Sequence, residues 1–165
     1  MTTTGLIATY YRYQQFATAR ILDAAERVPF EQLTVPVLDG FDPVRSAFVH
    51  TMWAQRLWLN RFMGKPRVPN FEPEEFESIA AIRERWAEID ADTNGFVASL
   101  TDKQLASPIA YGGLEGGVST YPLWQAMLHQ ANHQTYHRGE IAAVLTHLGS
   151  SPGEMDFFRM FDGRQ

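Results

Sequence analysis

The sequence contains three histidines spaced four residues apart, and imidazole side chains can bind metal ions or transfer protons. His129, His133 and His137 lie in the run WQAMLHQANHQTYHRGEIAAVLTHL, residues 124–148. On a helix with about 3.6 residues per turn, this spacing places the imidazoles close to one line on a single face. Two imidazoles four residues apart can reach one metal ion, and metal-binding helices use this spacing. The pair His133 and His137 therefore predicts one side of a metal site.

The same line of the helix continues through apolar residues in both directions, which predicts that the imidazoles are buried. A buried polar group must be hydrogen-bonded or must ligate something. Gly139 interrupts this stripe at a cost of about 1 kcal/mol relative to alanine, so we expect another backbone or a ligand to approach there. The apolar positions of the line are Leu123, Ala126, Ile141, Val144, Leu145 and Leu148.

The histidine pattern leaves two interpretations open. The rings could be packed and hydrogen-bonded inside the core, or they could bind a metal ion. Ligation is favoured by His50, which lies in another predicted helix and could face the pair. The chain has no cysteine, so a metal here would be held by imidazole and oxygen ligands.

Composition describes one ordinary globular domain that covers residues 1–165. Hydrophobic residues make up 45% of the chain and charged residues 20%, which excludes a disordered protein. The net charge is −5 with no evident Lys/Arg cluster, so nucleic-acid binding is not expected. The N-terminus lacks a signal peptide pattern, and no apolar run approaches the roughly 18 residues of a membrane span. We expect a cytoplasmic protein without a membrane segment.

Helical periodicity predicts an all-α fold, a four-helix bundle. The expected helices cover residues 6–27, then Asp42-Pro43 to Phe62, Ser78 to Ser99, and Thr120/Pro122 to Leu148, with proline and glycine signals at the ends. Asp42 is expected to cap the second helix with Pro43 as its first residue, and Ser78 is expected to cap the third. Residues 28–40, 65–77 and 101–120 read as loops, long ones for a simple up-down-up-down bundle. Within the last, Gly-rich loop, residues 111–119 fit either a short hairpin or a mobile segment.

Aromatic residues are more numerous than one bundle core obviously needs. The tail SPGEMDFFRMF, residues 151–161, is too apolar to be free and should pack on the bundle or on a second subunit. Tyr10, Tyr11, Tyr13 and Phe16 add aromatic surface to the first helix. The surplus is a weak indication of a homodimer, and crowding in the core would explain it equally well.

Two segments give the chain a resemblance to a known family. They are LHQANHQTYHRGE at residues 128–140 and HTMWAQRLWLNRF at residues 50–62, with Leu145, Gly149, Pro152 and Asp156 downstream. The chain resembles the DinB/YfiT-like family of damage-inducible proteins, which is distinct from the DNA polymerase of the same name. The resemblance implies a four-helix bundle, commonly dimeric, with a divalent metal held by three histidines. By position these are His50, His133 and His137, with zinc as the first candidate ion and nickel as the second.

Glu140 and His129 are the candidates for supporting roles. The family more often has glutamine after HRG, so Glu140 adds either an acceptor near the site or merely a surface charge. His129 lies one turn before the ligand pair, where it could fix a ligand's tautomer or be a satisfied core or interface histidine. No general base is obvious unless one of these two reaches the open position. His147, near the helix end, is assigned no function.

The three-histidine pattern favours a metal-dependent enzyme acting on a small molecule. Three imidazoles leave a coordination position open, as in catalytic zinc sites. The chemistry would be hydrolysis, or transfer or isomerisation with a low-molecular-weight thiol, which the wider superfamily suggests by analogy. The alternatives are a non-catalytic metal or small-ligand binding protein of the stress response, and an interaction module with core histidines. An accessible polar pocket would favour the enzyme, whereas a site closed by Trp53 or by the tail would favour storage.

Overall fold

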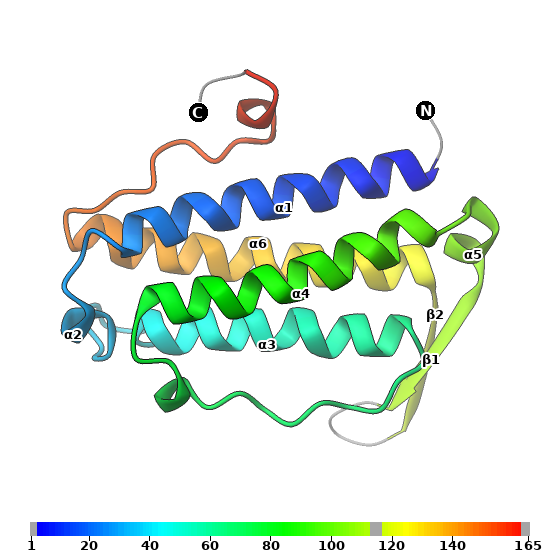
Figure 1. The fold of residues 1–165 in the computed structure, drawn as a ribbon, viewed down its shortest axis with the longest axis horizontal. Coiled ribbons are helices and arrows are strands. Elements are labelled where there is room, and N and C mark those ends of the chain that lie inside the picture. Colours follow the sequence, from blue (N-terminus) through cyan, green and yellow to red (C-terminus); the bar gives the residue numbers. More distant parts are fainter. Residues whose placement is uncertain (1–2, 113–116, 163–165) are drawn as a thin grey trace.

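The computed structural model describes residues 3–112 and 117–162, and this part of the chain is mostly helical (Figure 1). None of its helices combines the length and the apolar character that crossing a membrane requires. The long helices are α1 (Thr3–Ala25), α3 (Val44–Phe62), α4 (Ile79–Ser99) and α6 (Leu123–His147). The short elements are α2 (Phe30–Leu33), η1 (Pro73–Glu75), α5 (Asp102–Ala106), β1 (Pro108–Gly112), β2 (Val118–Pro122) and η2 (Phe157–Met160).

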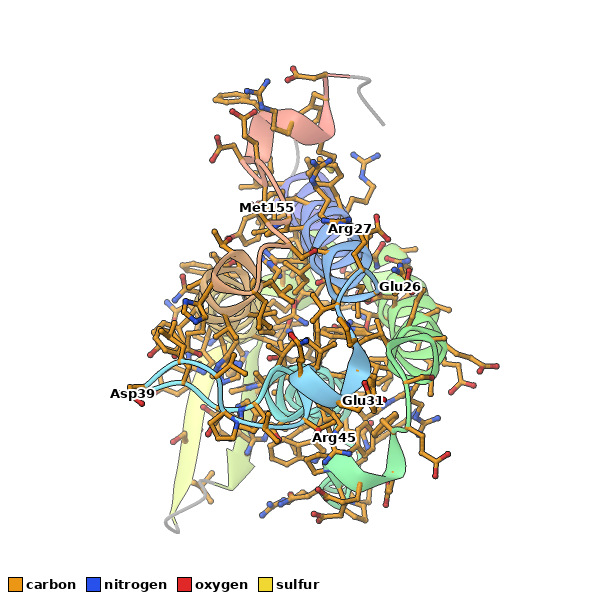
Figure 2. All side chains as sticks on the ribbon, turned by 90° about the vertical axis from the view of Figure 1, so that its left-hand side faces the viewer. Glu26, Arg27, Glu31, Asp39, Arg45 and Met155 are labelled. Atoms are coloured by element: carbon orange, nitrogen blue, oxygen red, sulfur yellow. The ribbon has the colours of Figure 1, made fainter. Side chains whose placement is uncertain are left out.

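The four long helices lie side by side, and the end-on view of Figure 2 shows them around one core. Each of α1 and α3 packs against both α6 and α4. Helices α3 and α4 run in the same direction, because the segment between them returns along the length of α3 (Figure 1). Helix α6 runs opposite to α3, so the face between these two helices brings together residues far apart in the sequence.

The predicted N-cap residue is confirmed for helix α4 and is wrong for helix α3. Ser78 caps α4 as predicted, and its hydroxyl accepts a hydrogen bond from the Ala81 amide at 3.1 Å. The prediction that Asp42 caps α3 is wrong. The cap residue is Pro43, no side chain caps this end, and Val44 is the first helical residue. The Asp42 carboxylate is thereby left for another role.

Part of the segment expected to be irregular, residues 101–120, is regular. Helix α5 begins with a capping box, in which the Thr101 hydroxyl and the Gln104 side chain accept from each other's backbone amides. Strands β1 and β2 form an antiparallel hairpin in which Pro108 pairs with Pro122 and Gly112 with Val118. The hairpin is one of the two alternatives left open, and residues 113–116 within it lie outside the described residues. The fold is therefore not purely helical, as it adds a small two-stranded sheet.

The C-terminal tail packs on α1, which confirms the first of its two predicted placements. The Tyr13 hydroxyl donates to the Met155 carbonyl at 2.9 Å, and the Phe157 ring lies edge-on to Tyr13 with centroids 5.2 Å apart. Figure 2 shows Met155 on the segment that crosses the α1 side of the molecule. Much of the aromatic surplus is thus used within one chain, because the tail covers the rings of α1.

A polar network crosses the core between α3, α4 and α6. The Gln55 carbonyl accepts from Trp86 Nε1 at 2.8 Å and from Gln134 Nε2 at 2.6 Å. The Gln55 amide donates to Asp90 Oδ1 at 2.8 Å and to Thr93 Oγ1 at 3.2 Å. Gln55, Gln134 and Trp86 are all buried. One side chain therefore links three helices and fixes their register.

Asp90 makes this network sensitive to pH. Burial raises the pKa of Asp90 to about 6, although the hydrogen bond from Gln55 opposes the rise. Between the unfolded pKa of about 4 and this value the native state binds more protons, so stability falls as pH rises. We expect Asp90→Asn, which keeps the acceptor, to raise the free energy of unfolding by about 1 kcal/mol at pH 8 and by much less at pH 4.

Chemical denaturation at the two pH values measures this difference. The control is Asp92→Asn, because Asp92 pairs with Arg56 on the surface at 2.8 Å. An exposed pair of this kind contributes about 0–1 kcal/mol, so its loss should leave stability unchanged or slightly lower at pH 8. An Asp90→Asn variant that is no more stable than the wild type at pH 8 would contradict the buried-charge interpretation.

Candidate metal centre

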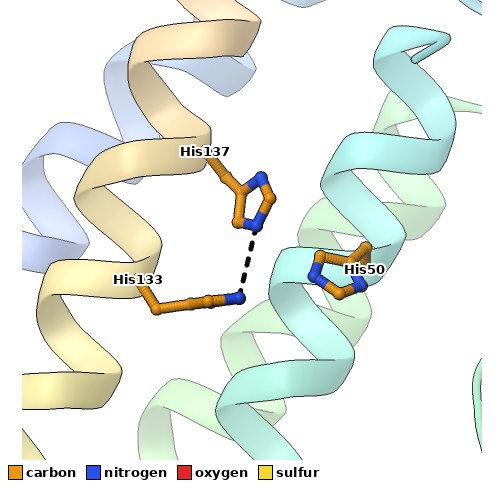
Figure 3. A group of neighbouring side chains, drawn as sticks. All are labelled: His50, His133 and His137. Carbon is orange, nitrogen blue, oxygen red and sulfur yellow. Dashed lines mark hydrogen bonds between the residues drawn. The ribbon is translucent and has the colours of Figure 1, made fainter. Parts of the chain in front are cut away.

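Three histidines from two helices face one another across the α3–α6 interface (Figure 3). His50 comes from α3, and His133 and His137 come from successive turns of α6. One ring nitrogen from each residue lies within 4.8 Å of those of the other two. The ring centroids of His50 are 4.8 Å from His137 and 5.4 Å from His133. The structure thus brings together the three residues that the sequence nominated as ligands.

The spacing of the imidazole nitrogens fits a single ion. The Nε2 atoms of His133 and His137 are 3.2 Å apart. Two tetrahedral ligands at about 2.0–2.1 Å from zinc would be separated by about 3.3 Å. The third nitrogen belongs to His50, whose side chain is exposed and whose nitrogen lies within 4.8 Å of the other two.

Glu140 fixes the orientation of one of these rings. Its Oε2 atom lies 2.7 Å from His137 Nδ1 and accepts a hydrogen bond from it. This bond assigns the proton of a neutral His137 to Nδ1, which leaves the Nε2 lone pair facing His133 and His50. A carboxylate behind a ligating imidazole is the usual arrangement at protein metal sites. Of the two predicted supporting residues, Glu140 is the one that contacts the group.

Electrostatics keep at least two of the imidazoles neutral near pH 7. The pKa of His133 is lowered to about 4, first by burial and then by the neighbouring histidines, His137 foremost, against the opposing effect of Glu140. Burial and then His137 also lower the pKa of His50, against the opposing effect of Asp42 and Glu140. A neutral imidazole offers the lone pair that a metal needs.

The contacts of His133 do not fit a satisfied core histidine. Its Nδ1 atom is buried and has no hydrogen-bond partner in the described part of the chain. Its Nε2 atom meets only another imidazole nitrogen, and at most one of that pair can carry the shared proton. Within the described residues this ring therefore has one polar contact, the His137 imidazole, and its buried Nδ1 atom has none.

Two expectations about α6 are wrong. The buried polar residues of this helix are Gln130, Gln134 and Arg138, so the histidines lie at the edge of the buried face and not along its centre. Gly139 is exposed, and an added Cβ there would meet nothing within 4 Å. No close approach explains this glycine, and the structure offers no other reason for it.

His129 lies beyond the three-histidine group, toward the other end of α3. Its exposed ring packs against Trp58 with centroids 5.0 Å apart. Its charge contributes to the lowered pKa of His133, but it is not among the three residues whose nitrogens converge. His147, to which no function was assigned, is exposed at the end of α6.

A cavity of about 330 Å³ opens beside His50 and His137. Its size suits a small molecule. Neither of the two groups that could have closed this cavity lines it. Trp53 Nε1 donates to the Pro69 carbonyl while its ring centroid lies 6.0 Å from that of His50, and the tail lies on α1. The lining residues are Gly40, Phe41, Asp42, Val44, Ala47, His50, His137, Glu140, Ile141 and Val144.

Asp42 is the residue of this cavity that sequence reasoning missed. It was interpreted as the cap of α3, which the structure excludes. Asp42 is exposed and lines the cavity, and within the described residues its carboxylate has no ion pair and no hydrogen bond. The proline that follows it gave the helix start, and nothing in the local pattern indicated a second use for the acid.

The chain is similar in sequence and in fold to known proteins. The sequence model of the DinB family matches residues 1–164. Protein DinB of Bacillus subtilis (strain 168) is 22% identical over 155 residues, which cover 89% of this chain and 88% of that protein. A solved structure of a conserved protein from Enterococcus faecalis is similar with a TM-score of 0.68 at 12% identity, over 88% of this chain and 96% of that one. The structural likeness concerns the fold alone.

Proposed function

The chain belongs to the DinB family, and we propose that it binds a divalent metal ion through His50, His133 and His137 and uses it as an enzyme on small molecules. The observation that carries this proposal is the convergence of three imidazoles, two of them neutral near pH 7 and one oriented by Glu140. Zinc is the first candidate ion and nickel the second. We also assign the four long helices to the four-helix bundle that the family resemblance implies.

The open cavity supports an enzyme over a storage protein. A divalent ion with a free coordination position would activate water or a bound thiol or carbonyl, which allows hydrolysis or thiol-dependent transfer or isomerisation. The chain's own residues divide the remaining work. The apolar lining residues Val44, Ile141 and Val144 would hold the substrate body in the same cavity that His50 and His137 line.

We assign the two carboxylates of the cavity to different roles. Glu140 already accepts the Nδ1 proton of His137, so it is a positioning residue. The Tyr136 hydroxyl also bonds to Glu140, which raises the pKa of Tyr136. Asp42 has no such partner in the described residues and is the carboxylate free to accept a proton from a molecule in the cavity.

Metal content is the test of this proposal. We expect about one zinc or nickel ion per chain in protein purified without a His tag, and almost none in the His133→Ala, His137→Ala double variant. Elemental analysis by mass spectrometry measures both. The matched control is His147→Ala, which removes an exposed imidazole from the same helix and should keep the ion.

Two outcomes would contradict the proposal. A wild-type protein that carries no metal and takes up neither added zinc nor added nickel would remove the metal site altogether. Equal metal content in the wild type and the double variant would place the ion elsewhere. If the ion is present but screens for hydrolysis and thiol transfer find no turnover, the non-catalytic binding protein becomes the better description.

The homodimer and the cytoplasmic location stay predictions. The exposed apolar residues Leu6, Trp124 and Leu128 lie together around one surface hollow and support an interface there. The side chains of Phe158 and Phe161 on the tail are exposed as well. These exposed rings support a dimer, as does the high aromatic content of the sequence.

A further inference from the structure

A second hollow, near the C-terminal end of α3, is lined by basic residues. It has a volume of about 330 Å³ and contains no acidic residue among its lining residues, which are Arg61, Gly64, Lys65, Arg67, Ala110, Tyr111 and Gly112. The sequence shows no evident Lys/Arg cluster. In the structure, however, Arg61, Lys65 and Arg67, at the end of α3 and just after it, lie together beside strand β1. In a chain of net charge −5, such a gathering is not explained by overall composition.

Arg61 is held in place by two aromatic rings. Its guanidinium carbon lies 4.6 Å from the ring centroid of Trp58 and 4.6 Å from that of Tyr111. The two rings meet edge to face, with centroids 5.0 Å apart, so they form a corner that fixes the guanidinium plane. Stacking of this kind uses the faces of the guanidinium and leaves the N–H groups at its edge free for acceptors.

No carboxylate of the described residues neutralises these cations. Arg61 has neither an ion pair nor a hydrogen bond there, and burial lowers its pKa. Arg67 donates only to the amide oxygen of Asn70, at 3.3 Å. Five other arginines pair with a carboxylate, namely Arg45, Arg56, Arg83, Arg85 and Arg159. Arg12, Arg20, Arg27 and Arg138 each donate to a hydroxyl or carbonyl oxygen, so Arg61 differs from all of these in having neither kind of partner in the described residues. A partly buried guanidinium without a counter-charge is a preorganised site for an anion.

An aromatic pocket adjoins this basic hollow. It has a volume of about 290 Å³ and is lined by Trp58, Tyr111, Tyr121, Gln125, Ala126 and His129. Tyr111 lines both spaces, and Trp58 lines this pocket and also stacks with Arg61. A ligand with an anionic group on Arg61 would therefore place an attached planar or apolar body against these rings.

We propose that the hollow of Arg61, Lys65 and Arg67 binds the oxyanion of a small molecule, a phosphate or carboxylate, whose planar or apolar body lies in the adjoining aromatic pocket. This site is separate from the metal centre. Arg61 follows His50 by 11 residues on α3, about 16 Å along the helix axis. The proposal therefore does not depend on the metal, and each can fail without the other.

Calorimetric titration of the metal-stripped full chain with inorganic phosphate and with phenyl phosphate tests the site. We expect saturable binding of both, with phenyl phosphate the tighter. Arg61→Gln should weaken both about tenfold or more, because it removes the charge and the forked donor together. Tyr121→Ala should reduce phenyl phosphate affinity toward that of inorganic phosphate and leave the latter unchanged.

Three further variants separate the site from general charge, from misfolding and from the metal centre. Arg12→Gln removes the same charge from an exposed position on α1 and should have no effect. Lys65→Gln removes an exposed cation of the hollow without disturbing the packing of Arg61 and should weaken phosphate a few-fold. The His133→Ala, His137→Ala variant should bind phosphate as well as the wild type does.

Several results would overturn the proposal. They are the absence of saturable phosphate binding, equal weakening by Arg12→Gln and Arg61→Gln, or loss of binding in the double histidine variant. Equal affinity for the two phosphates in the wild type would overturn the part that assigns the ligand body to the aromatic pocket. A thermal melt of each variant shows whether the fold is kept, and a misfolded Arg61→Gln leaves Lys65→Gln to decide.

Discussion

Replacing Gln55 with leucine is expected to lower the free energy of unfolding by about 3 kcal/mol. The substitution keeps most of the volume but leaves two buried donors, Trp86 Nε1 and Gln134 Nε2, without an acceptor. Each buried donor that loses its partner costs about 1–3 kcal/mol. Asp90 and Thr93 lose the amide that donates to them.

Urea denaturation followed by circular dichroism measures this loss at constant pH. The matched control is Gln15→Leu, because Gln15 also bonds across two helices, to Asn94 at 2.8 Å, but at an exposed site. We expect the control to cost about 0.5 kcal/mol or less, since water can replace its partner. Equal effects of the two substitutions would mean that the Gln55 network does not hold the core together.

The Gln55 variant should also weaken metal binding. Gln55 lies on α3 five residues after His50, and its partner Gln134 is the neighbour of His133 on α6. The hydrogen bond between the two glutamines joins the helices that carry the ligands, so its loss frees one helix to shift against the other. A destabilised variant with unchanged metal affinity would show that packing alone keeps the histidines in register.

The helices could be predicted because their signals are local. Apolar periodicity and the proline and glycine boundaries gave all four long helices, and Ser78 was recognised from its position alone. The hairpin was less certain because its strands are short and its turn is built of glycines, which favour several conformations. The prediction that Asp42 caps α3 was wrong by one position, because Pro43 is the cap residue and Val44 the first helical residue.

The site could be predicted only where its members share a helix. His133 and His137 follow from a four-residue spacing, but His50 became a candidate through the family resemblance and its place on another helix. The histidines lie beside the buried face and not on it, because Gln130, Gln134 and Arg138 occupy that face. A helical hydrophobicity pattern assigns Gln and Arg to the solvent-facing side of a helix. The buried face of α6 and the Gln55 network could therefore not be recognised from the sequence.

The basic hollow around Arg61 could not be predicted from the sequence either. Arg61 and Arg67 are six residues apart and look like ordinary surface charges in the sequence. What makes Arg61 distinctive is Tyr111, which comes from the hairpin some 50 residues later in the chain and completes the aromatic corner. Only the tertiary structure shows that this guanidinium lacks a carboxylate partner in the described residues.

Replacing Glu140 with alanine is expected to weaken metal binding by about 10- to 100-fold without removing a ligand. The carboxylate accepts the Nδ1 proton of His137 at 2.7 Å, so it fixes the ring orientation and makes Nε2 a better donor. Without it, the ring can rotate and the other tautomer becomes accessible. Competition with a chromophoric zinc chelator at pH 7.5 measures the change in affinity.

The glutamine variant separates orientation from charge. Glu140→Gln keeps an oxygen that can accept from Nδ1 but loses the negative charge, so its affinity should fall between those of the wild type and Glu140→Ala. Glu84→Ala removes an exposed carboxylate from α4 and should have no effect. If both Glu140 variants bind zinc as the wild type does, the bond to His137 is a surface contact. If Glu140→Gln and Glu140→Ala weaken zinc binding equally, the negative charge of Glu140 determines the affinity. The acceptor oxygen that glutamine keeps would then make no contribution.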